Sequence, residues 1–247
     1  MSHNSMKTII IIPSRMASVR FPNKPMALID GIPMVQRVWQ QAIKSNLGAV
    51  VVACCEKEVF DLITSLGGEA TLTSPELPSG TDRIFEVIKN HPEGHQFDSI
   101  INLQGDMPII TPSDIKKVNI PLIQGFDIGT LVTNLSIKDE EDINITKVKI
   151  NWITKNNLGE ASDFYKKPKK QITNIYHHVG IYSFRYESLK KFVYLKPSVN
   201  ELYYKLEQWR ALDCQMKIGA CFVDNVPLSV DTEEDLIKVE NIIKTDK

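Results

Sequence analysis

The sequence is poor in cysteine and lacks long apolar runs, and both shortages exclude classes of protein. Four cysteines occur in 247 residues, at Cys54, Cys55, Cys214 and Cys221, without the paired spacing of a metal site. The apolar runs are far shorter than the ~20 residues of a membrane span. The first residues lack the basic start and apolar core of a secretory signal. We therefore expect free thiols and a cytoplasmic location.

The sequence also lacks a glycine-rich nucleotide-binding loop near its start and a large net charge. The stretch from Arg15 to Lys24 contains no glycine, which argues against the dinucleotide fingerprint of an NAD-binding oxidoreductase and against the P-loop. The chain has 29 basic and 30 acidic residues, a formal net charge of -1. Such a balance does not favour a general nucleic-acid surface.

Apolar β-branched runs alternate with segments of helical period, a pattern typical of an α/β fold. We predict a Rossmann-like, mostly parallel sheet flanked by helices, in one domain over residues 1–247. The predicted strands are Thr8–Pro13, Ala49–Ala53, Glu69–Leu72, Ser99–Leu103, Ile128–Leu135, Lys147–Thr154, Tyr176–Phe184 and Lys217–Phe222. The predicted helices are Met34–Ser45, Glu58–Leu66, Thr81–Lys89, Pro112–Ile123, Arg185–Tyr194, Asn200–Leu212 and a last one from Thr232. A polar, lysine-rich stretch from Lys155 to Lys170 indicates a small β-rich insertion or dimerisation flap around 140–200.

A basic loop follows the first predicted strand. Arg15, Arg20 and Lys24 come directly after the apolar run, and no acidic residue precedes Asp30. Ligands of α/β sheets bind at the carboxyl ends of strands, and arginine and lysine grip phosphate oxygens. The loop therefore predicts a polyphosphate site, with a solvated surface loop as the alternative.

Two aspartates are candidate metal ligands. Asp106 follows a predicted buried strand within Gln104-Gly105-Asp106, and Asp231 precedes the predicted last helix. A hard divalent ion that bridges phosphates commonly uses one or two carboxylates. An Asx-turn at Asp106 and helix-dipole pairing near Asp231 are the structural alternatives.

A turn of small polar residues opens the third predicted helix. Ser79, Gly80, Thr81 and Asp82 either cap this helix or let a nucleobase approach the backbone closely.

Polar residues gather in two later segments. Strand alternation places His178 and Tyr182 on one face, away from His177. Glu207 and Gln208 lie on a predicted helix, where they either form its polar face or, with the strand residues, recognise a polyhydroxylated acid.

Together these residues resemble the CMP-Kdo synthetase family, which activates 3-deoxy-manno-octulosonate (Kdo) for lipopolysaccharide synthesis. The resemblance covers nearly the whole chain and rests on six segments in family order. They are Ile11 to Pro25, Ser79 to Arg83, Gln104 to Asp106, His178 to Tyr182, Leu206 to Arg210 and Val230 to Leu236.

The resemblance implies a nucleotidyltransferase (GT-A-like) fold, a homodimer and a Mg2+-dependent cytidylyltransferase. Arg15, Arg20 and Lys24 would bind the phosphates of CTP, and Ser79 to Asp82 its base and ribose. Asp106 and Asp231 would hold Mg2+. The sugar acid would meet the side chains of Gln104, His178, Tyr182, Glu207 and Gln208.

The sequence departs from the family pattern at three places. Met107 stands where the family usually has glutamate, Cys54-Cys55-Glu56 where it has an aspartate-rich turn, and Lys166 or Lys167 where it has an arginine. Lysine does not reproduce the bidentate fork of arginine. Alternative acceptors are therefore 8-amino-Kdo or another nonulosonic acid, and a catalytically silent nucleotide-binding homologue is a further alternative.

Overall fold

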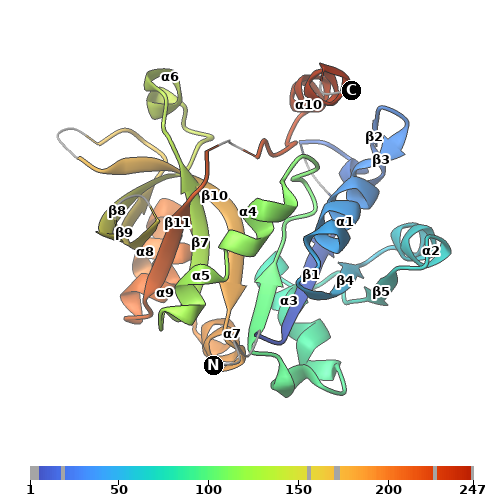
Figure 1. The fold of residues 1–247 in the computed structure, drawn as a ribbon, viewed down its shortest axis with the longest axis horizontal. Helices are drawn as coiled ribbons and strands as arrows, with labels where there is room; N and C mark the ends of the chain where they lie inside the picture. The colour runs from blue at the N-terminus through green and yellow to red at the C-terminus, as the bar shows by residue number, and fades with distance from the viewer. Residues whose placement is uncertain (1–5, 18–19, 155–156, 170–172, 225–226, 246–247) are drawn as a thin grey trace. The chain divides into compact units, whose positions relative to one another are not determined.

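A computed structural model describes residues 6–17, 20–154, 157–169, 173–224 and 227–245 (Figure 1). The chain divides into two compact units: unit 1 holds Met1–Lys116 and Pro227–Lys247, and unit 2 holds Lys117–Val226. No helix in the described ranges is both long and apolar enough to cross a membrane.

The sheet of unit 1 is parallel, as predicted. Its strands run in the order β5, β4, β1, β6, with β1 paired to both β4 and β6. Ile9 to Ile12 at the centre of β1 are fully buried, which explains the continuous apolar run. The bounds are β1 Thr8–Ser14, β4 Gly48–Cys54, β5 Glu69–Leu72 and β6 Ser99–Asn102.

Helices and one small hairpin accompany this sheet. They are η1 Lys24–Met26, β2 Leu28–Ile29, β3 Ile32–Pro33, α1 Met34–Ser45, α2 Lys57–Ser65, α3 Gly80–Asn90, η2 Gly94–Gln96, α4 Pro112–Lys117 and α10 Glu233–Thr245. A core of Ile29, Met34, Val230 and Val239 joins the hairpin and α1 to the C-terminal segment. The last helix is thereby fixed beside residues that are distant in sequence.

Unit 2 has a mixed sheet, so the prediction of a mostly parallel sheet is wrong there. Strands β7 and β11 are parallel, but β10 pairs antiparallel with β7 and β8, and β9 pairs antiparallel with β8 and β11. The bounds are β7 Ile128–Thr133, β8 Lys147–Thr154, β9 Leu158–Tyr165, β10 Ile175–Phe184 and β11 Ile218–Phe222. Strand β9 lies in the lysine-rich stretch for which no strand was predicted.

The helices of unit 2 are short. They are α5 Ile120–Ile123, α6 Ile137–Glu141, α7 Tyr186–Tyr194, α8 Val199–Tyr204 and α9 Gln208–Asp213. A buried ion pair joins the last two, because Arg210 Nε donates to Glu201 Oε2 at 2.8 Å. Arg210 is thus a structural residue.

Candidate functional site

A cavity of about 380 Å3 lies within unit 1. It is lined by Pro13, Ser14, Arg15, Ala17, Arg20, Lys24, Pro25, Met34, Ser79, Gly80, Arg83, Gln104, Gly105, Asp106 and Asp231. Its size falls in the range of small-molecule sites. The four segments predicted to bind a nucleotide and a metal thus all contribute to this cavity. They are the loop after β1, the loop after β6, the turn before α3 and the segment of Asp231.

The basic loop begins where β1 ends. The backbone N–H of Asn23 donates to the Met16 carbonyl at 3.2 Å, which closes the loop just before Lys24 opens η1. Arg15 and Arg20 are exposed, whereas the Lys24 side chain is only 15% exposed. The loop therefore presents two exposed arginines and one largely buried lysine to the cavity.

Asp106 lies in the loop that follows β6. A Cβ atom at Gly105 would lie 3.0 Å from the Pro13 carbonyl oxygen, so glycine lets this loop pass close to the end of β1. The Asp106 carboxylate bonds to Lys24 Nζ. Among the described residues it makes no hydrogen bond to its own turn, so the Asx-turn alternative is not observed.

Asp231 reaches the same place from the C-terminal segment. The Val230 N–H donates to the Asp106 carbonyl at 2.9 Å and ties the two loops together. Asp231 lies outside α10, as predicted. Thr232 and Asp235 cap this helix reciprocally, since the N–H of each donates to the side chain of the other, at 3.1 and 3.2 Å.

One ammonium group joins the two aspartates. Lys24 Nζ lies 2.8 Å from Asp106 Oδ2 and 3.2 Å from Asp231 Oδ1, and Arg20 Nη2 lies 3.1 Å from Asp231 Oδ1. Burial alone would lower the pKa of Lys24, but the Asp106 and Asp231 carboxylates raise it above its ordinary value. Lys24 is therefore firmly cationic, and two carboxylates distant in sequence face one position.

The small polar turn caps its helix. Asp82 N–H donates to Ser79 Oγ at 3.2 Å, and Ser79 Oγ donates to Asp82 Oδ2 at 2.6 Å. The capping alternative is thus observed. Ser79 and Gly80 also line the cavity, whereas Thr81 is buried. Capping therefore does not exclude ligand contact, because Ser79 forms the cap and lines the cavity at the same time.

Sequence reasoning gave no role to Arg83, which is 2% exposed and lines the cavity. It donates to Thr73 Oγ1 and to the Ser74 carbonyl. The sequence did carry a signal for a role of Arg83, because this charged residue stands among the apolar residues of the predicted helix.

Candidate sugar-acid residues divide between the units. Gln104 belongs to unit 1, where its Nε2 donates to Asn102 Oδ1 at 2.9 Å. In unit 2 the rings of His178 and Tyr182 lie 5.5 Å apart, which agrees with their predicted common face. Gln208 donates to the Tyr182 hydroxyl, and Glu207 directly precedes α9.

Both ring residues are uncharged near neutral pH. Burial, with a smaller effect of His177, lowers the pKa of His178 to about 3. Burial also raises the pKa of Tyr182 above its ordinary value. Thr130 Oγ1 lies 3.0 Å from His178 Nε2 and donates to the Ile181 carbonyl at 2.8 Å, so the histidine donates in that contact.

The three departures from the family pattern have different surroundings. Met107 is 1% exposed and packs in the core. Lys166 contributes its carbonyl to Lys147 Nζ at 2.8 Å, and Lys167 is exposed. Glu56 accepts a hydrogen bond from the basic loop.

Comparison with known sequences gives consistent matches over nearly the whole chain. Residues 9–218 match the family model described as cytidylyltransferase. The 3-deoxy-manno-octulosonate cytidylyltransferase of Paramagnetospirillum magneticum is 42% identical over 240 residues, covering 96% of this chain and 97% of that protein. The enzyme of the same name from Rhodospirillum rubrum is 37% identical over 239 residues, with 95% of each chain covered.

Solved structures give the same result. CMP:2-keto-3-deoxy-manno-octonic acid synthetase complexed with CTP superposes with a TM-score of 0.88 at 30% identity, covering 98% of this chain and 100% of that one. UDP-glucose pyrophosphorylase complexed with UDP-glucose has a TM-score of 0.68 at 13% identity, with 98% and 100% covered, a likeness of fold alone. The fold is thus a mixed α/β fold of the nucleotidyltransferase kind.

Proposed function

The chain belongs to the cytidylyltransferase family, and from that premise we propose that it transfers CMP from CTP to the anomeric 2-hydroxyl of Kdo. The hydroxyl oxygen forms a bond to the α-phosphorus of CTP and the bond to the bridging oxygen breaks. Pyrophosphate leaves, and the hydroxyl proton is released. The names of the relatives and the CTP complex of the similar structure support both substrates.

One observation carries the proposal: Arg20, Lys24, Asp106 and Asp231 meet at one cavity. Cations alone would suit many anions. The added pair of carboxylates suits a triphosphate that arrives with a divalent ion, because such ions bridge phosphates to one or two carboxylates. The combination therefore favours nucleotidyl transfer over simple anion binding.

The basic loop and the α3 turn would hold CTP between them. Arg15 and Arg20 have the exposure and reach to grip phosphate oxygens in pairs. Lys24, anchored by carboxylates, would place its charge at a fixed point near the α-phosphate. Ser79 to Asp82 would read the base and ribose, with Gly80 allowing close approach.

Asp106 and Asp231 fit a Mg2+ ion by their donor chemistry. Both offer hard carboxylate oxygens at one point of the cavity, and no cluster of three or more His, Cys, Asp or Glu groups occurs in the described part of the chain. Two protein ligands leave the remaining positions for water and phosphate oxygens. A bound Mg2+ would neutralise phosphate charge and favour ionisation of the attacking hydroxyl.

The sugar acid would meet a neutral, directional set of groups. His178 stays unprotonated near neutral pH, so it would orient hydroxyl groups rather than transfer protons. Tyr182 accepts from Gln208 and keeps its own proton for a substrate oxygen. Glu207 and Gln104 would complete the recognition of a polyhydroxylated acceptor. Catalysis would rest mainly on positioning and charge neutralisation.

A pyrophosphate-release panel tests this function. Purified protein with CTP and Mg2+ is given Kdo, 8-amino-Kdo or another nonulosonic acid, each with and without chelator. We expect release with Kdo that a chelator abolishes. Preference for another acid would reassign the acceptor. CTP binding without release from any acid would instead indicate a silent homologue.

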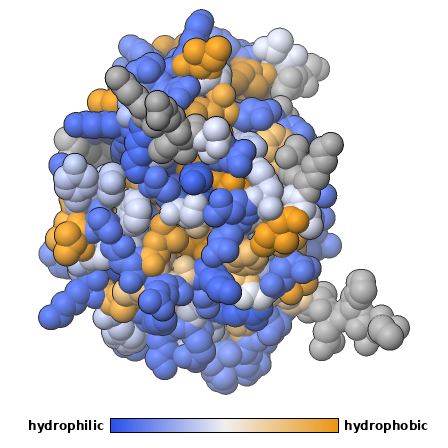
Figure 2. All heavy atoms as spheres, turned by 90° about the vertical axis from the view of Figure 1, so that its left-hand side faces the viewer, coloured by the Kyte–Doolittle hydropathy of each residue, from blue (hydrophilic) through white to orange (hydrophobic). Residues whose placement is uncertain are grey.

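We also propose that the chain works as one domain and as a homodimer, with residues around 140–200 forming the contact. Ile153, Val199, Leu202 and Tyr203 in this region are each more than 60% exposed. Apolar side chains are visible on the face shown in Figure 2. Sedimentation should give about twice 28.0 kDa, and Leu202→Asp should reduce it to one chain. A single-chain mass for the unaltered protein would contradict the dimer.

A cytoplasmic location remains part of the proposal. The four cysteines are free thiols, which suits a reducing compartment.

A further inference from the structure

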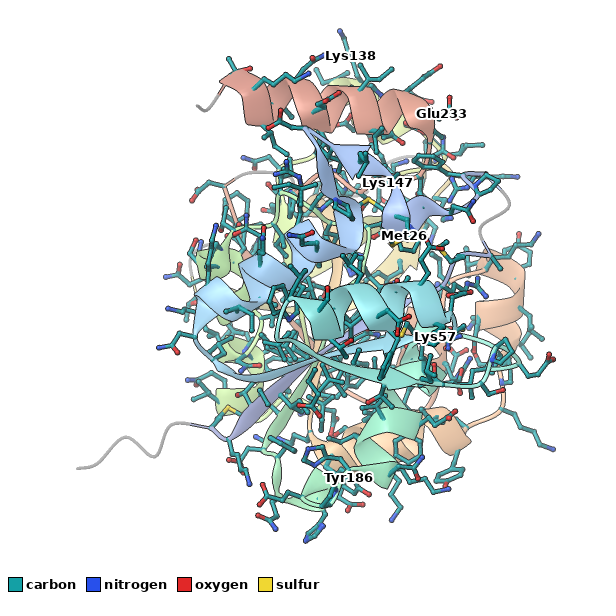
Figure 3. The ribbon with its side chains drawn as sticks, turned by 90° about the vertical axis from the view of Figure 1, so that its right-hand side faces the viewer. Met26, Lys57, Lys138, Lys147, Tyr186 and Glu233 are labelled. Atoms are coloured by element: carbon teal, nitrogen blue, oxygen red, sulfur yellow. The ribbon has the colours of Figure 1, made fainter. Side chains whose placement is uncertain are left out.

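Glu56 directs its carboxylate away from its own helix. It is the N-cap residue of α2, yet its side chain makes no capping bond. Its Oε1 instead accepts from the backbone N–H of Met16 at 3.1 Å, forty positions earlier in the chain. Figure 3 shows Lys57, the first residue of α2, on the same side of unit 1 as Met26 at the end of η1.

Met16 is the base of the predicted phosphate loop. Its carbonyl accepts from Asn23 N–H, so the loop closes between these two residues. Arg15 immediately precedes this closure and Lys24 immediately follows it. One carboxylate therefore fixes the backbone at the point from which the basic residues depart.

Stability alone does not account for this placement. Glu56 Oε2 is buried and has no hydrogen-bond partner among the described residues. A buried carboxylate oxygen without a partner opposes folding.

The pKa of Cys55 reports the charges around this carboxylate. Burial raises it, Arg83 lowers it, Glu56 raises it and Arg15 lowers it, with a raised pKa as the result. Arg83, Glu56 and Arg15 thus all act on this one thiol.

We propose that Glu56 is a positioning residue that holds the loop of Arg15, Arg20 and Lys24 in its triphosphate-binding form through the Met16 amide. The inference rests on the proposed function, because it concerns how that site is held. Glu56 acts through the backbone of Met16 and needs no contact with substrate.

Three variants and one control test this role. Glu56→Ala removes the acceptor, and Glu56→Asp shortens its reach. Glu56→Gln keeps an oxygen in place and removes the charge. Glu58→Ala removes an exposed carboxylate from the first turn of the same helix.

The proposal predicts a loss in KM rather than in kcat. Glu56→Ala and Glu56→Asp should raise KM for CTP about tenfold, equivalent to about 1.4 kcal/mol, with kcat changed less than threefold. Glu56→Gln and Glu58→Ala should stay within threefold of the unaltered protein. Equal losses in Glu56→Gln and Glu56→Ala, or unchanged KM in Glu56→Ala, would overturn it.

Hydrogen exchange of the Met16 amide, followed by NMR without nucleotide, gives a readout that does not depend on activity. The amide should exchange slowly in the unaltered protein and in Glu56→Gln, and at least tenfold faster in Glu56→Ala. Unchanged exchange in Glu56→Ala would remove the anchor. If the unaltered protein fails to bind CTP while this pattern holds, the proposed function fails and the anchoring of the loop stands.

Discussion

At the scale of single residues, Lys24 is the centre of the candidate site. Its ammonium lies within 3.2 Å of carboxylates from two loops that are 125 residues apart, Asp106 and Asp231. Sequence patterns predicted all three as phosphate or metal ligands, because each lies beside the end of a strand or helix. They could not bring the aspartates together, because that contact depends on the packing of α10 against the hairpin.

Replacing one of these carboxylates should separate catalysis from folding. Asp106→Asn keeps the shape of the side chain but removes the charge proposed to hold Mg2+. We expect Mg2+-dependent kcat/KM to fall by at least ~100-fold, since preorganised charge at a phosphoryl site contributes on this order. Thermal unfolding should change little, because Asp231 still pairs with Lys24 and Asp106 is partly exposed.

The matched control is Asp61→Asn, which removes a carboxylate from an exposed i,i+4 pair with Lys57. This variant should retain full turnover. If Asp106→Asn also turned over at the unaltered rate, Asp106 would have no place in the proposed metal site.

At the scale of elements, segments with one clear period were the easiest to predict. β5, β8 and α1 have their predicted bounds, because each is a run of one clear period between turn residues. Strand β9 was missed. Its sequence Leu158 to Tyr165 carries glycine and two acids, and only its pairing with β8 and β11 makes it a strand.

Two predicted helices are each divided. Pro112–Ile123 splits into α4 and α5, and Asn200–Leu212 splits into α8 and α9 at Lys205, which adopts a left-handed φ of 55°. Apolar periodicity continues across both breaks, so it could not reveal them. Pro121 was a usable signal for the first break, because it lacks an N–H for the preceding turn.

Side-chain contacts across elements were beyond sequence reasoning. Glu56 was noted only as a departure from a family pattern, and its bond to Met16 depends on β4 lying beside β1 in the sheet. Arg83 was part of a recognised segment, yet its burial beside the cavity follows from how α3 packs. The sequence thus predicted which loops form the candidate site, but it did not predict the side-chain contacts that fix those loops.

At the scale of the whole molecule, the two units hold different parts of the proposed chemistry. Every residue proposed to bind CTP or Mg2+ belongs to unit 1, whereas His178, Tyr182, Glu207 and Gln208 belong to unit 2. Binding of CTP and binding of the sugar acid should therefore protect different segments from hydrogen exchange.

Hydrogen exchange measured by mass spectrometry tests this division. CTP with Mg2+ at ~100 times its Kd stabilises the binding form by about 2.7 kcal/mol. Protection should rise at 20–25, 79–84, 103–107 and 229–232. Segments 176–184 and 206–210 should gain protection when the sugar acid is added with CMP, which permits no turnover.

ATP is the control, since it shares the triphosphate but not the base, and should protect 79–84 less than CTP does. Equal protection of 176–184 by CTP alone would contradict the assignment of substrates to units, because no residue of that strand is proposed to touch the nucleotide.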